Sequence, residues 1–290
     1  MKTLNRFSCT ALAAALLTLG GCEVIKGMEV GGESLAPLAN AGEKLAQTGS
    51  TSEQEETQIG RHMAGTLVGI KPLLRDSHEQ RYVNRVGLWV ALHSSRPTVD
   101  WRFGILDDND VNAFAAPGGY VFITRGLLAL LNNEAELAGV LSHEIAHVTY
   151  RHHLNAVRNG NLMGAALDVG MFIGDAATGG KAGSTERDLA QRAVNASRTL
   201  YARGLDKGDE YEADAEALRL MTLSGYDPYA FVAVMQTLDA RAARDSGMAL
   251  LLQTHPRPAD RLQAMADIME SLPVTGPQAT LPDRFRQAVR

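Results

Sequence analysis

The segment Ser142-His143-Glu144-Ile145-Ala146-His147 lies in an apolar stretch with helical periodicity, and it constrains the chain more than any other feature. Histidines at positions i and i+4 lie on one helix face, about one turn apart. Two imidazoles placed in this way can bind one zinc ion, and Glu144 can reach a water on that ion. The uncharged neighbours allow burial of the helix, which strengthens the electrostatic effect of an ion.

A third ligand from the same segment is not expected. His153 follows His147 by six residues, the spacing of a third histidine in proteins where a glycine turns the chain back, but Tyr150 occupies the glycine position. We expect the helix to continue to about His153. His153 would then lie about 120° around the helix and roughly 9 Å along it from His147, too far to bind the same ion. His152 is excluded for the same reason.

The segment Asp209-Glu210-Tyr211-Glu212-Ala213-Asp214 is a better source of a third ligand. On a helix, Glu210 and Asp214 share a face, whereas Glu212 points about 200° away from Glu210. One of the two carboxylates that share a face can bind zinc while the other supports a ligand histidine from behind. The spacing alone does not decide which carboxylate has which role.

A series of short motifs occurs in a fixed order along the chain. They are Asn112-Ala113-Phe114-Ala115 with Pro117-Gly118-Gly119-Tyr120, Arg125-Gly126-Leu127-Leu128, Glu134-Ala135-Glu136-Leu137, the His143–His147 segment, Glu210-Tyr211-Glu212-Ala213-Asp214, Gly225-Tyr226-Asp227-Pro228 and Thr254-His255-Pro256. In this order, roughly residues 50 to 270 resemble the zinc metallopeptidases of the CAAX prenyl protease and HtpX-type heat-shock protease family, of the gluzincin group. The resemblance is closest to their small periplasmic lipoprotein members.

The resemblance implies roles for individual residues. His143, His147 and Glu210 would bind one zinc ion per chain, with Glu144 as the base and Asp214 supporting a ligand. The substrate cleft would be bordered by Asn112, Ala113, Phe114 and Ala115. The expected fold class is α+β and predominantly helical, a gluzincin-type metallopeptidase domain with a small β-sheet next to the motif helix.

Peptide hydrolysis passes through a tetrahedral oxyanion that needs a hydrogen-bond donor besides zinc. His255 is our candidate for this catalytic role, although it could instead occupy the open zinc position and keep the enzyme shut. The further candidates are Arg198, Tyr201 and Arg261.

The N-terminus has the pattern of a secretory signal. Lys2 and Arg6 precede the short apolar run 9–19, and Leu19-Gly20-Gly21-Cys22 then resembles a bacterial lipobox. We predict a signal peptide at 1–21, a lipid on Cys22 and a flexible tether over 22–50. Glu23 is not the aspartate typical of retention in the inner membrane, which favours the outer membrane, facing the periplasm.

The remaining pattern predicts a single metallopeptidase domain at 51–270 and a loose C-terminal tail at 271–290. Helices are expected from Ser52, from Asp76 or Ser77 to about His93, from Asn133 to about His153, and from about Thr185 to Gly225. Strands are expected at 99–106, 111–115 and 120–124.

Composition narrows the function classes. The net charge of −5 gives no reason to expect a nucleic-acid partner. We predict a zinc-dependent endopeptidase that hydrolyses misfolded or unassembled envelope proteins, whose unfolded chains would pair with an edge strand in 111–124. The alternatives are a chaperone or assembly factor for outer-membrane proteins that binds chains in the cleft, and an inert scaffold stabilised by zinc.

Overall fold

The computed structural model describes the chain in several stretches, namely residues 29–30, 33–34, 52–156, 205–242, 244–255, 257–273 and 276–289. Strands β1 (Glu29–Val30) and β2 (Glu33–Ser34) pair in antiparallel fashion within the predicted tether. The predicted signal peptide, Cys22 and the rest of the tether lie outside the described residues. Residues 53 to 290 form one compact unit.

This unit is mostly helical with a small sheet, as predicted. Its helices are α4 (Glu53–Ile70), α5 (Ser77–Ala91), α6 (Arg125–Leu128), α7 (Glu134–Thr149), α10 (Lys207–Ser224), α11 (Tyr229–Ala242), α12 (Ala249–Thr254), α13 (Pro258–Ser271) and α14 (Pro282–Ala288), with a 3-10 turn at Ser246–Met248. The strands are β3 (Arg102–Leu106), β4 (Ala113–Ala116) and β5 (Tyr120–Thr124), in the order β3-β5-β4. The central strand β5 is parallel to β3 and antiparallel to β4.

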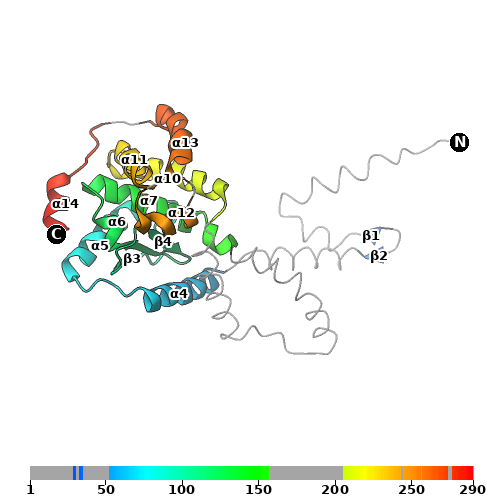
Figure 1. The fold of residues 1–290 in the computed structure, drawn as a ribbon. Helices are drawn as coiled ribbons and strands as arrows, with labels where there is room; N and C mark the ends of the chain where they lie inside the picture. Colours follow the sequence, from blue (N-terminus) through cyan, green and yellow to red (C-terminus); the bar gives the residue numbers. More distant parts are fainter. Residues whose placement is uncertain are drawn as a thin grey trace. The chain divides into compact units, whose positions relative to one another are not determined.

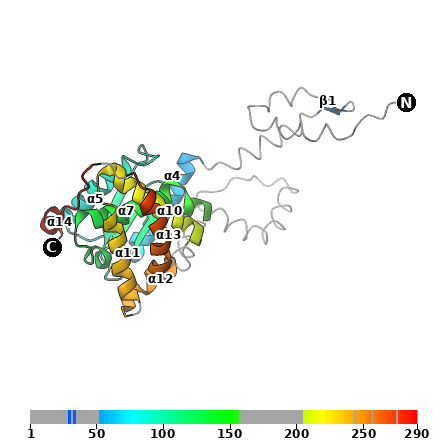
Figure 2. The same ribbon diagram turned by 90° about the horizontal axis from the view of Figure 1, so that it is seen from above.

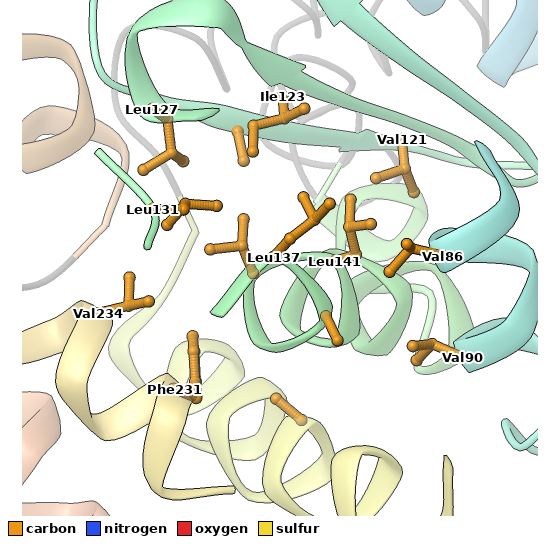
Figure 3. Close-up of a cluster of buried hydrophobic side chains, with 14 of the residues drawn as sticks. Val86, Val90, Val121, Ile123, Leu127, Leu131, Leu137, Leu141, Phe231 and Val234 are labelled. Atoms are coloured by element: carbon orange, nitrogen blue, oxygen red, sulfur yellow. The ribbon is translucent and has the colours of Figure 1, made fainter. Parts of the chain in front are cut away.

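Helix α7 is the centre of the packing (Figure 1), and each of its residues is buried. Its Leu137 and Leu141 point toward Val121 and Ile123 of the sheet, while Phe231 of α11 lies on the opposite side (Figure 3). Asn133 caps the helix as predicted, because its side chain accepts the backbone N–H of Glu136 at 2.9 Å. The sequence of the motif therefore folds as a helix buried on all sides.

The C-terminal end of α7 differs from the prediction. The helix ends at Thr149, and Arg151 has a φ of 60°, in the left-handed region. This conformation costs about 1 kcal/mol for a residue with a side chain. It is held by an ion pair of 3.1 Å between Arg151 and the buried carboxylate of Glu56 on α4. The chain therefore turns after α7, and the predicted continuation of the helix to about His153 is wrong.

Helix α4 is fixed against the sheet and the end of α7. Arg96 binds both oxygens of Glu56, at 2.8 and 3.0 Å, and also donates to the backbone carbonyl of Val148. At Gly60 the helix contacts the turn between β4 and β5, where a Cβ atom would lie 1.6 Å from the carbonyl oxygen of Pro117. Figure 1 shows α4 on the face of the sheet opposite to α7.

The predicted loose tail is wrong for the described residues of 271–290. Helix α14 packs on α5 and α7, and its Phe285 and Ala288 are buried in the main core. The strand-like segment before it pairs through Ala279 with Tyr226. Tertiary packing orders this segment even though its short, proline-containing sequence has no sustained periodicity.

The predicted helix from about Thr185 to Gly225 is described only in part. Helix α10 begins at Lys207 and ends at Ser224, and the capping residue Gly225 has a φ of 82°, which suits a helix C-terminus. Residues 157–204 lie outside the described part of the chain. No helix among the described residues is long and apolar enough to span a bilayer.

Candidate active site

Helices α7 and α10 lie side by side (Figure 2) and bring together the predicted metal ligands. His143 and His147 come from α7, Glu210 from the first turn of α10, and His255 from the residue after α12. One ligand atom from each of these four side chains lies within 4.8 Å of the others. The Nε2 atoms of His143 and His147 are 3.1 Å apart, so the two rings face a common point.

The donor set fits a metal cation. Both histidines and Glu210 are buried, and Glu210 Oε1 accepts no hydrogen bond from the described residues. A buried carboxylate oxygen without a donor costs free energy unless a ligand satisfies it. Burial and the charge of Arg261 disfavour a proton on His143, yet Asp214 and Glu210 raise the pKa of this ring to about 9. The site therefore favours positive charge at the point where the nitrogen and oxygen ligands converge.

Asp214 supports His143 from behind. Its Oδ1 lies 3.0 Å from His143 Nδ1, on the ring atom opposite to Nε2. Arg261 of α13 binds the same carboxylate with two hydrogen bonds, of 2.5 and 2.9 Å. Burial alone would raise the pKa of Asp214, but the charge of Arg261 and these hydrogen bonds lower it, so the carboxylate stays ionised. An ionised acceptor favours a proton on Nδ1 of His143, and Nε2 then faces the other ligand atoms.

His147 has an analogous partner that the sequence did not reveal. Its Nδ1 lies 2.9 Å from Nδ1 of His152, and Nε2 of His152 lies 3.1 Å from Oε2 of Glu212. His152 was excluded as a ligand because we expected a continuous helix. The turn at Arg151 instead places it behind His147. Glu212 points away from Glu210 on α10, and its carboxylate contacts His152.

Glu144 lies on the buried motif helix and lines a cavity shared with Glu210 and His255. Burial raises the pKa of Glu144, which makes its carboxylate a better proton acceptor. Burial also lowers the pKa of His147 well below its ordinary value, which favours the neutral ring.

Two of the oxyanion candidates, His255 and Arg261, lie at the ligand group. Nδ1 of His255 is 2.7 Å from Oε2 of Glu210, and His255 lines the same cavity as Glu144. Arg261 binds Asp214, and its guanidinium also lies 3.5 Å from Nε2 of His143 and 4.0 Å from Oε2 of Glu210. Arg198 and Tyr201 lie outside the described residues.

The sequence matches peptidase family M48 over residues 77–269. The chain belongs to this family. The match covers the motif helix, the crossing helix α10 and His255, and it confirms the resemblance inferred from the motifs.

Several named proteases are similar in sequence to this chain. The Beta-barrel assembly-enhancing protease of Escherichia coli K12 is 28% identical over 253 residues, which cover 82% of this chain and 50% of the relative. The Mitochondrial metalloendopeptidase OMA1 of Schizosaccharomyces pombe is 27% identical over 187 residues, 64% of this chain and 52% of the relative. The Metalloprotease YcaL of Escherichia coli K12 is 27% identical over 277 residues, 93% of this chain and 99% of the relative. The chain thus spans about half the length of the first two.

The segment 112–115, predicted to border the substrate cleft, lines the cavity with three of its four residues. Ala113, Phe114 and Ala115 line the cavity beside Glu144. Asn112 does not line it, because its side chain is fully buried and accepts the backbone N–H of Ala113. Its backbone pairs with the Thr124 hydroxyl, so Asn112 fixes the start of β4.

Proposed function

We propose that this chain is a zinc-dependent endopeptidase that hydrolyses misfolded or unassembled proteins of the bacterial cell envelope. The observation that carries the proposal is the buried group of His143, His147 and Glu210 next to Glu144, with one Glu210 oxygen left without a donor. Two histidine nitrogens and a glutamate carboxylate are a typical ligand set of a catalytic zinc site. Membership of a peptidase family and relatives named as proteases support the same activity.

In this proposal His143, His147 and Glu210 hold one zinc ion, and each histidine is oriented by the partner behind it, Asp214 or the pair of His152 and Glu212. When bound, zinc would act as a Lewis acid that polarises the substrate carbonyl and lowers the pKa of water. Glu144 accepts the proton from the attacking water and then delivers it to the nitrogen of the leaving amine. Its raised pKa suits both transfers.

His255 has two proposed roles that differ in their consequences. As a hydrogen-bond donor it would stabilise the oxyanion of the tetrahedral intermediate. As a fourth ligand it would occupy the position that the attacking water needs and would hold the enzyme latent. Its place among the ligand atoms supports the second role, and its place on the cavity wall supports both.

The substrate main chain is proposed to pair with β4. This strand lies at the edge of the described sheet, next to β5, and an extended substrate would add a further strand along it. Main-chain pairing requires an unfolded segment, which matches misfolded or unassembled proteins as substrates.

The proposed location is the periplasmic face of the outer membrane, with a lipid on Cys22 as the anchor. The lipobox-like Leu19-Gly20-Gly21-Cys22 supports the anchor. The name of the Beta-barrel assembly-enhancing protease supports a role in the quality control of outer-membrane proteins.

The direct test is casein cleavage by purified protein without residues 1–21. Cleavage should stop with a chelator and return with zinc, and Glu144→Gln should lower the rate by about 10³-fold while keeping the melting temperature. Undiminished cleavage by this variant would show that the activity comes from elsewhere. If neither protein cleaves but both bind unfolded casein, a chaperone-like binding function replaces the peptidase.

A further inference from the structure

A cavity of about 180 Å³ extends from the ligand group toward α4. Glu144 and Glu210 line one part of it. The rest of the wall is largely apolar and includes Met63, Leu67 and Ile70 of α4 and Phe122 of β5. The cavity is therefore polar where the proposed chemistry takes place and apolar beyond it.

The apolar wall is held in place by contacts outside the cavity. Gly60 allows α4 to touch the turn at Pro117, where any larger residue would collide with the backbone. Glu56, in the first turn of α4, is buried and bound by Arg96 and Arg151. Because both anchors fix α4, Met63 and Leu67, which follow along the same helix, have defined positions beside the sheet.

The size and lining of the cavity define the chemistry of its occupant. A protein cavity of about 150 Å³ with an apolar lining is large enough to bind a benzene molecule. A leucine, methionine or phenylalanine side chain would fit and would be removed from water, which is favourable. An acidic side chain would lose its hydration and would lie near the carboxylates of Glu144 and Glu210, both of which are unfavourable.

We infer that this cavity is the subsite for a substrate side chain beside the scissile bond, that it selects large apolar residues, and that Met63 and Leu67 set its depth. The inference rests on the proposed peptidase function. It adds a basis for substrate choice, because large apolar side chains are buried in folded proteins and become accessible when a protein is misfolded or unassembled. Selection by this subsite and main-chain pairing with β4 would thus favour the same substrates.

The test measures binding, using the zinc-loaded Glu144→Gln chain and fluorescent seven-residue peptides that differ only in the central residue. Peptides with leucine or phenylalanine should bind at least about tenfold more tightly than the alanine peptide, and the aspartate peptide should bind most weakly. Leu67→Trp in the same background should remove this preference, because the indole fills the cavity. Leu92→Trp is the matched control, since Leu92 is 61% exposed on the surface beyond α5, and it should keep the preference.

Two outcomes overturn the inference. Equal binding of the leucine and aspartate peptides would show that the cavity does not select apolar side chains. An unchanged preference in a folded Leu67→Trp variant would show that α4 does not form the subsite. If Leu67→Trp does not fold, Leu67→Ala takes its place and should shift the preference toward tryptophan, with no shift counting against the inference.

Failure of the subsite and failure of the peptidase function give different results. Casein cleavage by the wild type without any side-chain preference in peptide binding would leave the peptidase in place and remove the subsite. A preference without cleavage would leave the apolar subsite as part of a binding cleft and remove the peptidase.

Discussion

The two ends of α7 both have a buried carboxylate nearby, but the two carboxylates are satisfied to different degrees. At the first turn, Glu134 accepts hydrogen bonds from Tyr82 at 2.7 Å and Tyr226 at 2.6 Å and is also bound by Arg284. Near the other end, Glu210 is equally buried, yet its Oε1 accepts no hydrogen bond from the described residues, and Nε2 of His147 lies 3.6 Å from it. Both oxygens of Glu134 accept hydrogen bonds from the protein, whereas one oxygen of Glu210 accepts none from the described residues.

This difference suggests that the carboxylate at the start of α7 contributes to folding and the one near its end to function. A buried carboxylate whose donors are all present holds several elements together, and removing it leaves those donors without a partner. A buried carboxylate oxygen that accepts no hydrogen bond lowers the stability of the fold unless a ligand binds there. We therefore expect changes at the Glu134 end to affect folding, and changes at the Glu210 end to affect metal binding and catalysis.

The largest expected effect on folding is that of Glu134→Ala. The variant leaves two tyrosine hydroxyls and Arg284 without their acceptor, and its free energy of unfolding should fall by about 3 kcal/mol. Chemical denaturation measures this loss, with Glu270→Ala on the exposed face of α13 as the control. Zinc content and activity per folded molecule should stay unchanged. Loss of zinc in folded Glu134→Ala would remove the contrast between the two ends.

A smaller effect is expected from His152→Ala, which removes the partner behind His147. Partners of this kind contribute about 10- to 100-fold to metal affinity, so the dissociation constant for zinc should rise by that factor. Competition with a fluorescent chelator measures it. The melting temperature of the metal-free protein should change little, and His62→Ala on α4 should keep the wild-type affinity. An unaltered zinc affinity of His152→Ala would show that the contact with His147 has no role in binding.

The smallest expected effect is a dependence of stability on pH. Burial opposes the ionisation of Glu134, but hydrogen bonds from Arg284 and the two tyrosines lower its pKa below the ordinary value. A lowered pKa in the folded state stabilises the protein above the unfolded pKa, and this stabilisation is lost as the pH falls through the folded value. The difference in unfolding free energy between the wild type and Glu134→Gln should therefore shrink from pH 5 to pH 3. A difference that is constant over this range would mean that Glu134 has an ordinary pKa.

The sequence predicted those features that depend on local patterns. The motif helix, its Asn133 cap and the three strands follow from apolar periodicity and capping chemistry. The placement of Glu210 beside the two histidines followed from the resemblance to a family, together with the shared helix face of Glu210 and Asp214.

Features that depend on distant contacts could not be predicted in this way. The end of α7 is determined by Arg151, whose left-handed conformation is held by Glu56 on another helix. The position of His152 depends on that turn, so helical spacing does not predict its contact with His147. Helix α14 is ordered because Phe285 and Ala288 enter a core built by α5 and α7, which its own short sequence does not indicate.

The most direct test of the contrast between the two carboxylates is the zinc content of three purified proteins, measured by mass spectrometry of the metal. The wild type and Glu134→Ala should each contain about one zinc ion per folded chain, whereas Glu210→Ala should contain almost none. A wild type that takes up no zinc, or a Glu210→Ala variant that keeps its full complement, would contradict the assignment of this group as a metal site.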